Sequence, residues 1–229
     1  MVLRIGHRGA AGYEPENTLR SFEEAVRLGA DMVELDVHVC GSRELVVIHD
    51  ETVDRTTDGV GVVGEMVLHE LKALNAGKGE RIPTLGEVFS VLRERIAVNI
   101  ELKGRGTAEP VHEFLLRLVE ESGWHFGSVL VTSFDWDMLS RMRELSAETR
   151  VGLLTYRDVA KAVDMASQLK AYSVNPHHGN IDAGFVEEAH SQELRVYPWT
   201  VNKPGDILGV LGMGVDGIIS DFPDRVPKI

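Results

Sequence analysis

The chain has 229 residues, of which 43% are hydrophobic, so it can bury the core of one barrel-sized domain or of two small domains. Its 36 acidic and 24 basic side chains give a formal charge of −12. This charge argues against nucleic acid as a bulk partner, because phosphate backbones are bound through basic surfaces. The single cysteine, Cys40, cannot form an internal disulfide, so we expect a packed or incidental thiol.

No part of the sequence predicts a membrane span or a secretion signal. The first residues lack a long apolar core, and no apolar run reaches the length of a transmembrane helix. We therefore expect a cytoplasmic protein without stable membrane insertion. Its expected partner is a small molecule and not a nucleic acid, and a homo-oligomer is compatible with the sequence.

Short β-branched segments alternate with longer amphipathic segments along the chain. The expected strands are 2–5, 32–37 (extended or followed by 45–48), 96–100, 128–132, 150–154, 171–174, 194–197 and 215–219. The expected helices are 17–28, 109–121, 135–145, 158–169, 182–190 and 204–211. Strict alternation predicts a parallel sheet, and eight strand–helix units favour an α/β fold of the (β/α)8 TIM-type barrel class over a doubly wound open sheet.

The segment from Asp50 to Pro83 interrupts this alternation. It is rich in Gly, Thr and charged residues, and it is too long for an ordinary connection between a strand and a helix. We expect one TIM-barrel domain over residues 1–229, with a small insertion at about 50–83 after the second strand. The insertion is expected on the working face of the barrel, with a short helix near 68–74, and long loops on rigid scaffolds often carry binding roles.

Acidic side chains stand near the ends of two predicted strands. Glu34 and Asp36 are two residues apart on one strand, so their side chains point to the same face. Glu101 occupies the equivalent end of the next strand. Salt bridges to Arg8 and Lys103 would explain any one of these acids. Three carboxylates that can converge, without sulfur ligands, favour Mg²⁺ or Ca²⁺ over zinc.

Two histidines and two cations join these acids at the expected mouth of the barrel. His7 and Arg8 follow the first strand, His49 follows the 45–48 segment, and Lys103 follows the strand that carries Glu101. Histidine titrates near neutral pH, so one of the pair can act as base while the other acts as acid. Arg8 and Lys103 can hold phosphate oxygens and stabilise their charge in a transition state.

A capping signal precedes the first helix in the segment Pro15-Glu16-Asn17-Thr18. Asn17 or Thr18 can accept a hydrogen bond from the first helical turn, and Glu16 is expected to orient Arg8. The other histidines are interpreted as structural or loop residues, namely His38, His69, His112, His125, His177, His178 and His190.

Several short motifs, taken in order, resemble the glycerophosphodiester phosphodiesterase family. They are His7-Arg8-Gly9, Pro15-Glu16-Asn17-Thr18, Glu34-Leu35-Asp36-Val37, His49-Asp50, Asp54-Arg55-Thr56-Thr57, Ile82-Pro83-Thr84-Leu85-Gly86-Glu87, Asn99-Ile100-Glu101-Leu102-Lys103, Trp199-Thr200-Val201-Asn202 and Asp216-Gly217-Ile218-Ile219-Ser220-Asp221-Phe222-Pro223. Each motif is weak alone, but the ordered set spans essentially the whole chain, and no motif residue is missing.

The resemblance implies hydrolysis of glycerophosphodiesters to sn-glycerol 3-phosphate and an alcohol, with a divalent metal, Mg²⁺ or Ca²⁺. By position it implies metal ligands at Glu34, Asp36 and Glu101, an acid/base pair at His7 and His49, substrate contacts at Arg8, Lys103 and Trp199, and support from Glu16 and Asn17. Asn202 is a weaker match, because an Asn at a strand end can simply cap the next helix.

Three questions stay open at the level of the sequence. The attacking oxygen can belong to water or to a neighbouring hydroxyl of the substrate, which would give a cyclic phosphate. A related barrel phospholipase, lysophospholipase D-like or phosphoinositide-specific phospholipase C-like, would need an apolar rim, and the mixed charges of the insertion argue against one. A non-catalytic binding barrel is the third reading, although the intact set of histidines and acids argues against it.

Overall fold

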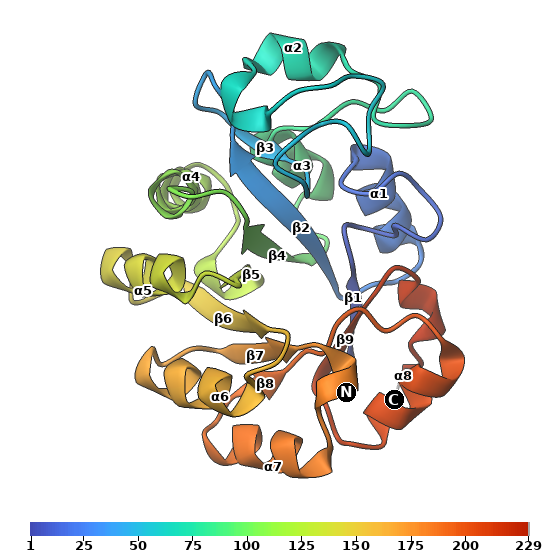
Figure 1. Cartoon of the computed structure of the whole chain (residues 1–229), viewed down its shortest axis with the longest axis vertical. Coiled ribbons are helices and arrows are strands. Elements are labelled where there is room, and N and C mark those ends of the chain that lie inside the picture. Colours follow the sequence, from blue (N-terminus) through green and yellow to red (C-terminus); the bar gives the residue numbers. More distant parts are fainter. Residues whose placement is uncertain (229) are drawn as a thin grey trace.

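Eight parallel strands form the wall of a barrel, and the helices lie outside it (Figure 1). The computed structural model describes residues 1–228. The parallel strands are β1 (Leu3–Gly6), β2 (Met32–Val39), β4 (Ala97–Leu102), β5 (Val129–Ser133), β6 (Arg150–Thr155), β7 (Ser173–Pro176), β8 (Arg195–Val196) and β9 (Gly217–Ser220). An additional strand, β3 (Leu45–Val47), pairs with β2 in an antiparallel hairpin. The predicted barrel class is confirmed.

The sheet runs in the order β8-β7-β6-β5-β4-β2-β1-β9, and hydrogen bonds beyond its two ends nearly close it. The N–H groups of Asp216 and Val201 donate to the carbonyl oxygens of Val196 and Ile219, at 3.1 and 2.9 Å. These bonds join the segments around β8 and β9, so the doubly wound open sheet is the wrong alternative.

Within residues 1–228, seven α-helices lie outside this wall and an eighth, α2, lies at its rim. They are α1 (Leu19–Arg27), α2 (Leu68–Ala73), α3 (Leu85–Leu92), α4 (Ala108–Glu121), α5 (Trp136–Leu145), α6 (Val159–Gln168), α7 (Ala183–Ser191) and α8 (Pro204–Leu211). Short 3₁₀ turns occur at Val63–Glu65, Phe126–Ser128, His178–Asn180 and Pro223–Arg225. No helix within residues 1–228 combines the length and the apolar character needed to cross a bilayer.

The sequence reading missed helix α3, which directly follows the Asp50–Pro83 segment. A capping box marks its start: Thr84 accepts a hydrogen bond from the Glu87 N–H, and the Glu87 carboxylate accepts one from the Thr84 N–H. The spacing Thr-x-x-Glu before an apolar run is the usual signal for such a start. The helix is short and apolar on several sides, so its hydrophobic periodicity is a weaker sequence signal for a helix than its capping box.

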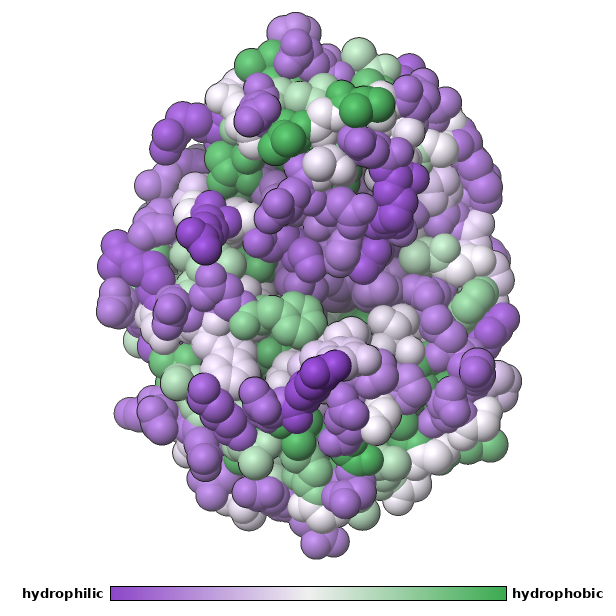
Figure 2. Space-filling view, in the orientation of Figure 1, coloured by the Kyte–Doolittle hydropathy of each residue, from purple (hydrophilic) through white to green (hydrophobic). Residues whose placement is uncertain are grey.

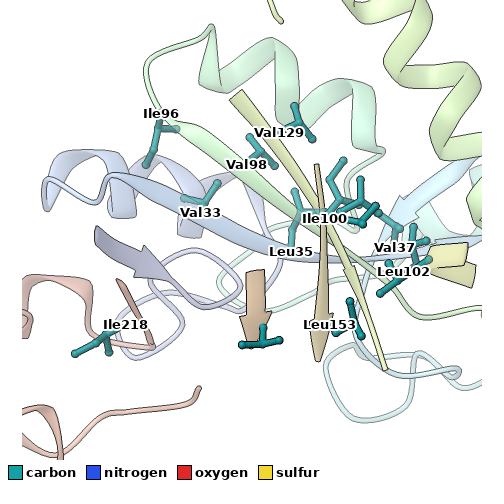
Figure 3. Packing of buried hydrophobic residues seen from close by; sticks show 14 of the residues in the cluster. Val33, Leu35, Val37, Ile96, Val98, Ile100, Leu102, Val129, Leu153 and Ile218 are labelled. Carbon is teal, nitrogen blue, oxygen red and sulfur yellow. The ribbon is translucent and has the colours of Figure 1, made fainter. Parts of the chain in front are cut away.

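Alternation along β2 separates the hydrophobic core from the barrel interior. Val33, Leu35 and Val37 are fully buried and pack against helix residues in the main hydrophobic cluster (Figure 3). Met32 faces the other way and joins the cluster that fills one end of the interior. Side chains two residues apart share a face, so Glu34 and Asp36 also point into the barrel. The interior is therefore apolar at one end and acidic at the other.

The segment between β3 and α3 has a small hydrophobic cluster of its own. Val53, Val63 and Leu71 pack there with Ile82 and with the buried thiol of Cys40. The short helix expected near 68–74 is present as α2. Because this cluster holds α2 against the β2–β3 hairpin, the segment rests on the rim of the barrel wall (Figure 1).

A tight turn after β1 places His7 and Arg8 at the mouth of the barrel. Gly9 has a φ of +88°, and a Cβ at this position would lie 2.6 Å from the carbonyl carbon of Ser21 in α1. Ser21 also fixes the turn from its side chain, which donates to the Arg8 carbonyl oxygen at 2.8 Å and accepts from the Ala10 N–H at 2.9 Å. Only glycine fits both the left-handed backbone and this close approach.

We expect Gly9→Ala to lower the free energy of unfolding by about 2–4 kcal/mol, because it adds a steric clash to the cost of the left-handed backbone. Gly79→Ala is the matched control: its φ is +83°, but no atom lies within 4 Å of the added Cβ. This control should cost about 1 kcal/mol. Urea unfolding measures both values, and equal losses would show that contact with Ser21 does not constrain the turn.

Candidate active site

The residues predicted for the site surround one cavity at the carboxyl ends of the barrel strands. Its lining includes His7, Arg8, Glu34, His49, Glu101, Lys103 and Trp199, together with Asn99, Thr132, Phe134, Leu154, Thr200 and Ile219. The site candidates Glu16, Asn17 and Asp36 contact these residues from behind. The fold therefore brings together all ten residues that the sequence singled out.

Three carboxylates converge in the acidic end of the barrel interior. Asp36 on β2 and Glu101 on β4 are direct partners in the register of the two strands, and Glu34 precedes Asp36 by two residues. One carboxylate oxygen of each lies within 4.8 Å of the others, and all three side chains are buried. Burial and the neighbouring carboxylates raise the pKa of Glu34 well above its ordinary value and the pKa of Glu101 to about 7.

Two cations compensate only part of this negative charge. The Lys103 ammonium donates to Glu101 Oε1 at 3.0 Å. The Arg8 N–H donates to Glu34 Oε2 at 2.9 Å, and Arg8 Nε lies 3.3 Å from Asp36 Oδ2. Asp36 Oδ1 is buried and has no hydrogen-bond partner. Because a buried, unpartnered carboxylate oxygen is costly, and because all the donors are oxygens, this cluster fits a hard divalent cation.

An aspartate holds each of the two candidate histidines. His7 Nδ1 lies 2.6 Å from Asp221 Oδ1, and His49 Nδ1 lies 2.5 Å from Asp50 Oδ1. Hydrogen bonds from Arg55 lower the pKa of Asp50. Burial alone would raise the pKa of Asp221, but hydrogen bonds from His7 and Asn202 bring it below its ordinary value. An ionised carboxylate only accepts, so Nδ1 carries the proton in both histidines and Nε2 is left for chemistry.

A charged donor lies beside the Nε2 atom of His49. The Lys103 ammonium donates to His49 Nε2 at 3.1 Å, which requires a lone pair there and therefore a neutral imidazole. Burial also lowers the pKa of His49. Lys103 thus contacts both a candidate acid/base group and the acidic cluster, which places the cluster and His49 in one connected network.

Three residues that support the histidines were absent from the predicted site. They are Asp50, Asp221 and Asn202, and each follows a strand end within one of the motifs that resemble the family. The Asn202 amide donates to Asp221 Oδ2 at 2.6 Å, and its oxygen accepts from the Asp221 N–H at 2.9 Å. Asn202 does not cap α8, whose N-cap residue is Lys203. The polar pair His49-Asp50 was the available signal for such a dyad.

In the segment before α1, one residue caps the helix and two others contact residues of the site. Thr18 caps the helix by accepting from the Ser21 N–H at 3.2 Å. Asn17, the other capping candidate, has a φ of +57° and donates to Asp36 Oδ2 at 2.8 Å. Glu16 accepts from Arg8 Nη1 at 2.7 Å, which is the contact that the sequence predicted. Asn17 therefore orients the acidic cluster and does not begin the helix.

Aromatic side chains form the opposite wall of the cavity. The Trp199 ring centroid lies 5.4 Å from that of Phe134 and 5.3 Å from that of His177. Tyr156 packs on His177 at 4.8 Å. Trp199 is held from behind by donation to the Asn175 carbonyl oxygen at 2.7 Å. His177, which was interpreted as a loop histidine, thus belongs to an aromatic wall at the ends of β5, β6 and β7.

The fold and the site are together those of a TIM-barrel enzyme, in which the reacting groups lie at the carboxyl ends of the strands. Comparison with known proteins narrows this class. The sequence pattern of the glycerophosphoryl diester phosphodiesterase family matches residues 7–225. The chain therefore belongs to this family, which confirms the resemblance seen in the sequence and the expected activity of a phosphodiesterase.

Individual relatives agree with this membership. A glycerophosphodiester phosphodiesterase of Caldanaerobacter subterraneus subsp. tengcongensis is 39% identical over 98% of this chain and 96% of its own length. One from Bacillus altitudinis is 38% identical over 100% and 98%. Among solved structures, an Oleispira antarctica phosphodiesterase in complex with the product sn-glycerol-3-phosphate superposes with a TM-score of 0.89 and 29% identity, covering 97% of this chain and 94% of that one.

We expect saturating Mg²⁺ or Ca²⁺ to raise the melting temperature more at pH 8 than at pH 5.5. The pKa of Glu101 is about 7, so a proton occupies this carboxylate at pH 5.5 and the cation must displace it. At pH 8 the cation meets an ionised Glu101 carboxylate, and a concentration of 100 Kd stabilises the protein by about 2.7 kcal/mol. Thermal unfolding at both pH values measures the difference.

Two variants locate this effect. Asp36→Asn should abolish the rise in melting temperature, because it removes the negative charge of the carboxylate that carries the unpartnered oxygen. Glu113→Gln removes an exposed charge on α4 and should leave the rise unchanged. A rise that persists in Asp36→Asn would place the cation outside the acidic cluster.

Proposed function

We propose that this protein hydrolyses glycerophosphodiesters to sn-glycerol 3-phosphate and an alcohol, with His7 and His49 as its acid/base pair. One observation carries the proposal: an acidic cluster with an unpartnered oxygen adjoins the same cavity as two histidines, each held by an aspartate with its proton on Nδ1. This arrangement supplies a cation site and two proton carriers around one cavity. Both can promote phosphodiester hydrolysis, the cation by stabilising charge and the histidines by moving protons.

The phosphate of the substrate is proposed to bind between Arg8 and Lys103. Each of these cations is already oriented, Arg8 by Glu16 and Lys103 by Glu101. Oriented cations stabilise the charge of a phosphoryl group without having to rearrange during the reaction. The complex of the Oleispira antarctica relative with the product sn-glycerol-3-phosphate supports a glycerol phosphate ligand for this protein.

Glu34, Asp36 and Glu101 would hold a divalent cation, Mg²⁺ or Ca²⁺, which would neutralise charge on the phosphoryl oxygens. One histidine takes the proton of the attacking hydroxyl through Nε2 while a new O–P bond forms. The other histidine, which enters the reaction as an imidazolium with protons on both ring nitrogens, gives its Nε2 proton to the leaving oxygen as the old P–O bond breaks. When water is the attacker, the products are sn-glycerol 3-phosphate and the free alcohol.

The leaving alcohol is proposed to lie against the aromatic wall, with Trp199 as its contact. The hydrophobic residues on the face in Figure 2 lie in separate patches and not in one continuous rim, which supports small glycerophosphodiesters over lipid substrates in a bilayer. The net charge of −12 supports a small-molecule partner over nucleic acid. A cytoplasmic location is proposed on the single, buried Cys40.

The direct test is product analysis on a panel of glycerophosphodiesters with Mg²⁺, with Ca²⁺ and with a chelator. Release of sn-glycerol 3-phosphate, and its loss in chelator, is the expected result. A lysophospholipid in vesicles is the competing substrate, and faster turnover of this lipid would favour the phospholipase alternative. Absence of turnover with every substrate and metal would favour the binding barrel.

We expect His7→Ala and His49→Ala each to lower kcat by about 100- to 10,000-fold, the usual contribution of a positioned acid or base. Both side chains are partly exposed at the cavity, so the fold should persist and the circular dichroism spectrum should not change. His69→Ala, at an exposed position of α2, is the control and should keep wild-type turnover. Near-normal turnover in either cavity variant would remove that histidine from the proposal.

A further inference from the structure

Arg55 lies in the segment between β3 and α3, and its guanidinium bridges two carboxylates. It donates to Asp50 from Nε at 2.7 Å and from Nη2 at 3.0 Å. It donates to Glu16 from Nη1 at 2.9 Å and from Nη2 at 2.8 Å. Two paired contacts of this kind use the planar fork of arginine on both sides, and a lysine cannot reproduce them.

Each of these carboxylates also holds a residue of the proposed site. Glu16 Oε1 accepts from Arg8 Nη1 at 2.7 Å, and Asp50 Oδ1 accepts from His49 Nδ1 at 2.5 Å. Arg55 therefore links a proposed acid/base histidine to a proposed phosphate contact, although its own hydrogen bonds go to Asp50 and Glu16. Its motif, Asp54-Arg55-Thr56-Thr57, was part of the family resemblance but had no role in the reaction described above.

The charges in this network depend on Arg55. Hydrogen bonds from Arg55 are the largest cause that lowers the pKa of Asp50. Burial would raise the pKa of Glu16, but Arg55 and Arg8 lower it. Both carboxylates are therefore ionised, and each accepts from the site residue that it orients. Without Arg55, the two negative charges would face each other across the vacated position, and each carboxylate would be free to rotate.

An isolated surface ion pair would have little consequence, since such pairs contribute about 0–1 kcal/mol to stability. Arg55 differs because its four hydrogen bonds converge on two oriented acceptors, and both acceptors are less exposed than Arg55 itself. We therefore expect loss of Arg55 to change the positions of His49 and Arg8 more than the stability of the protein. A displacement of about 1 Å in a reacting group can cost 100-fold in rate.

We propose that Arg55 is a positioning residue, which sets His49 through Asp50 and Arg8 through Glu16. The segment between β3 and α3 thereby fixes the distance between proton transfer and phosphate binding, from outside the barrel wall. This inference rests on the proposed roles of His49 and Arg8. It adds a residue that keeps the His49 imidazole and the Arg8 guanidinium in a fixed arrangement relative to each other.

The first test compares Arg55→Met and Arg55→Lys with a matched control. Arg55→Met should lower kcat at least 10-fold and should weaken inhibition by sn-glycerol 3-phosphate at least 5-fold. Arg55→Lys should recover part of both losses, because it restores the charge but not the fork. Arg20→Met removes an ion pair of similar exposure, with Glu14, and should leave both parameters within 2-fold.

Double variants separate the connection from Arg55 to His49 through Asp50 from the connection to Arg8 through Glu16. Asp50→Asn should lower kcat, and Arg55→Met should have little further effect on kcat in that background. Glu16→Gln should weaken inhibition by sn-glycerol 3-phosphate, and Arg55→Met should weaken it little further there. Such non-additivity is expected of residues in one network, whereas a purely structural residue would give additive losses.

Two outcomes would overturn the inference. One is an Arg55→Met protein that melts at a lower temperature but keeps the kcat and the inhibition constant of the wild type. The other is full additivity in both double variants. If Arg55→Met fails to fold, Arg55→Lys and the two single carboxylate variants decide the same question.

Reference variants distinguish this failure from failure of the proposed function. His49→Ala and Arg8→Met are measured in the same assay. Wild-type turnover in His49→Ala, or unaltered inhibition in Arg8→Met, would mean that the proposed site is wrong. Severe losses in both reference variants, together with an unaffected Arg55→Met, would overturn only the role of Arg55.

Discussion

The mutual repulsion of three buried carboxylates is the constraint on which the rest of the site depends. Glu34, Asp36 and Glu101 share the interior of one barrel wall, and this position raises the pKa of both glutamates. A protein tolerates such a cluster only when cations or protons compensate it. The Arg8 turn, the Lys103 side chain and the Asn17 amide all converge on these oxygens. The surrounding loops are therefore arranged by charge as much as by packing.

The alternation of strands and helices was sufficient to predict the barrel, because the period of the hydrophobic pattern encodes which residues face the helices. The inward direction of Glu34 and Asp36 followed from the same period. Closure was favoured only by the number of strand–helix units, because the hydrogen bonds that produce it join segments outside the periodic pattern, such as Val201 and Ile219. Helix α3 was missed because its signal was a cap and not a period.

The candidate site was predictable where a residue type is unusual for its place, such as an acid inside a parallel strand. It was not predictable where the role depends on a partner. Asp221 is ordinary at a strand end, and only the fold shows that it holds His7, 214 residues away in sequence. The same holds for Asn17, which matched the capping pattern as well as Thr18 did. Its left-handed backbone turns its amide toward Asp36 and removes it from the helix.

The β2–β3 hairpin has a consequence for how this barrel can change. Strand β2 pairs with β3 and also with β4, so the chain leaves the wall beyond Val39 and returns to it beside the same strand. Asp36 and Glu101 consequently remain neighbours whatever the length of chain between them. The rim of the cavity can therefore be lengthened, shortened or exchanged in evolution while the acidic cluster keeps its geometry. The condition is that the new rim still contains the residues that hold His49, namely Asp50 and Arg55.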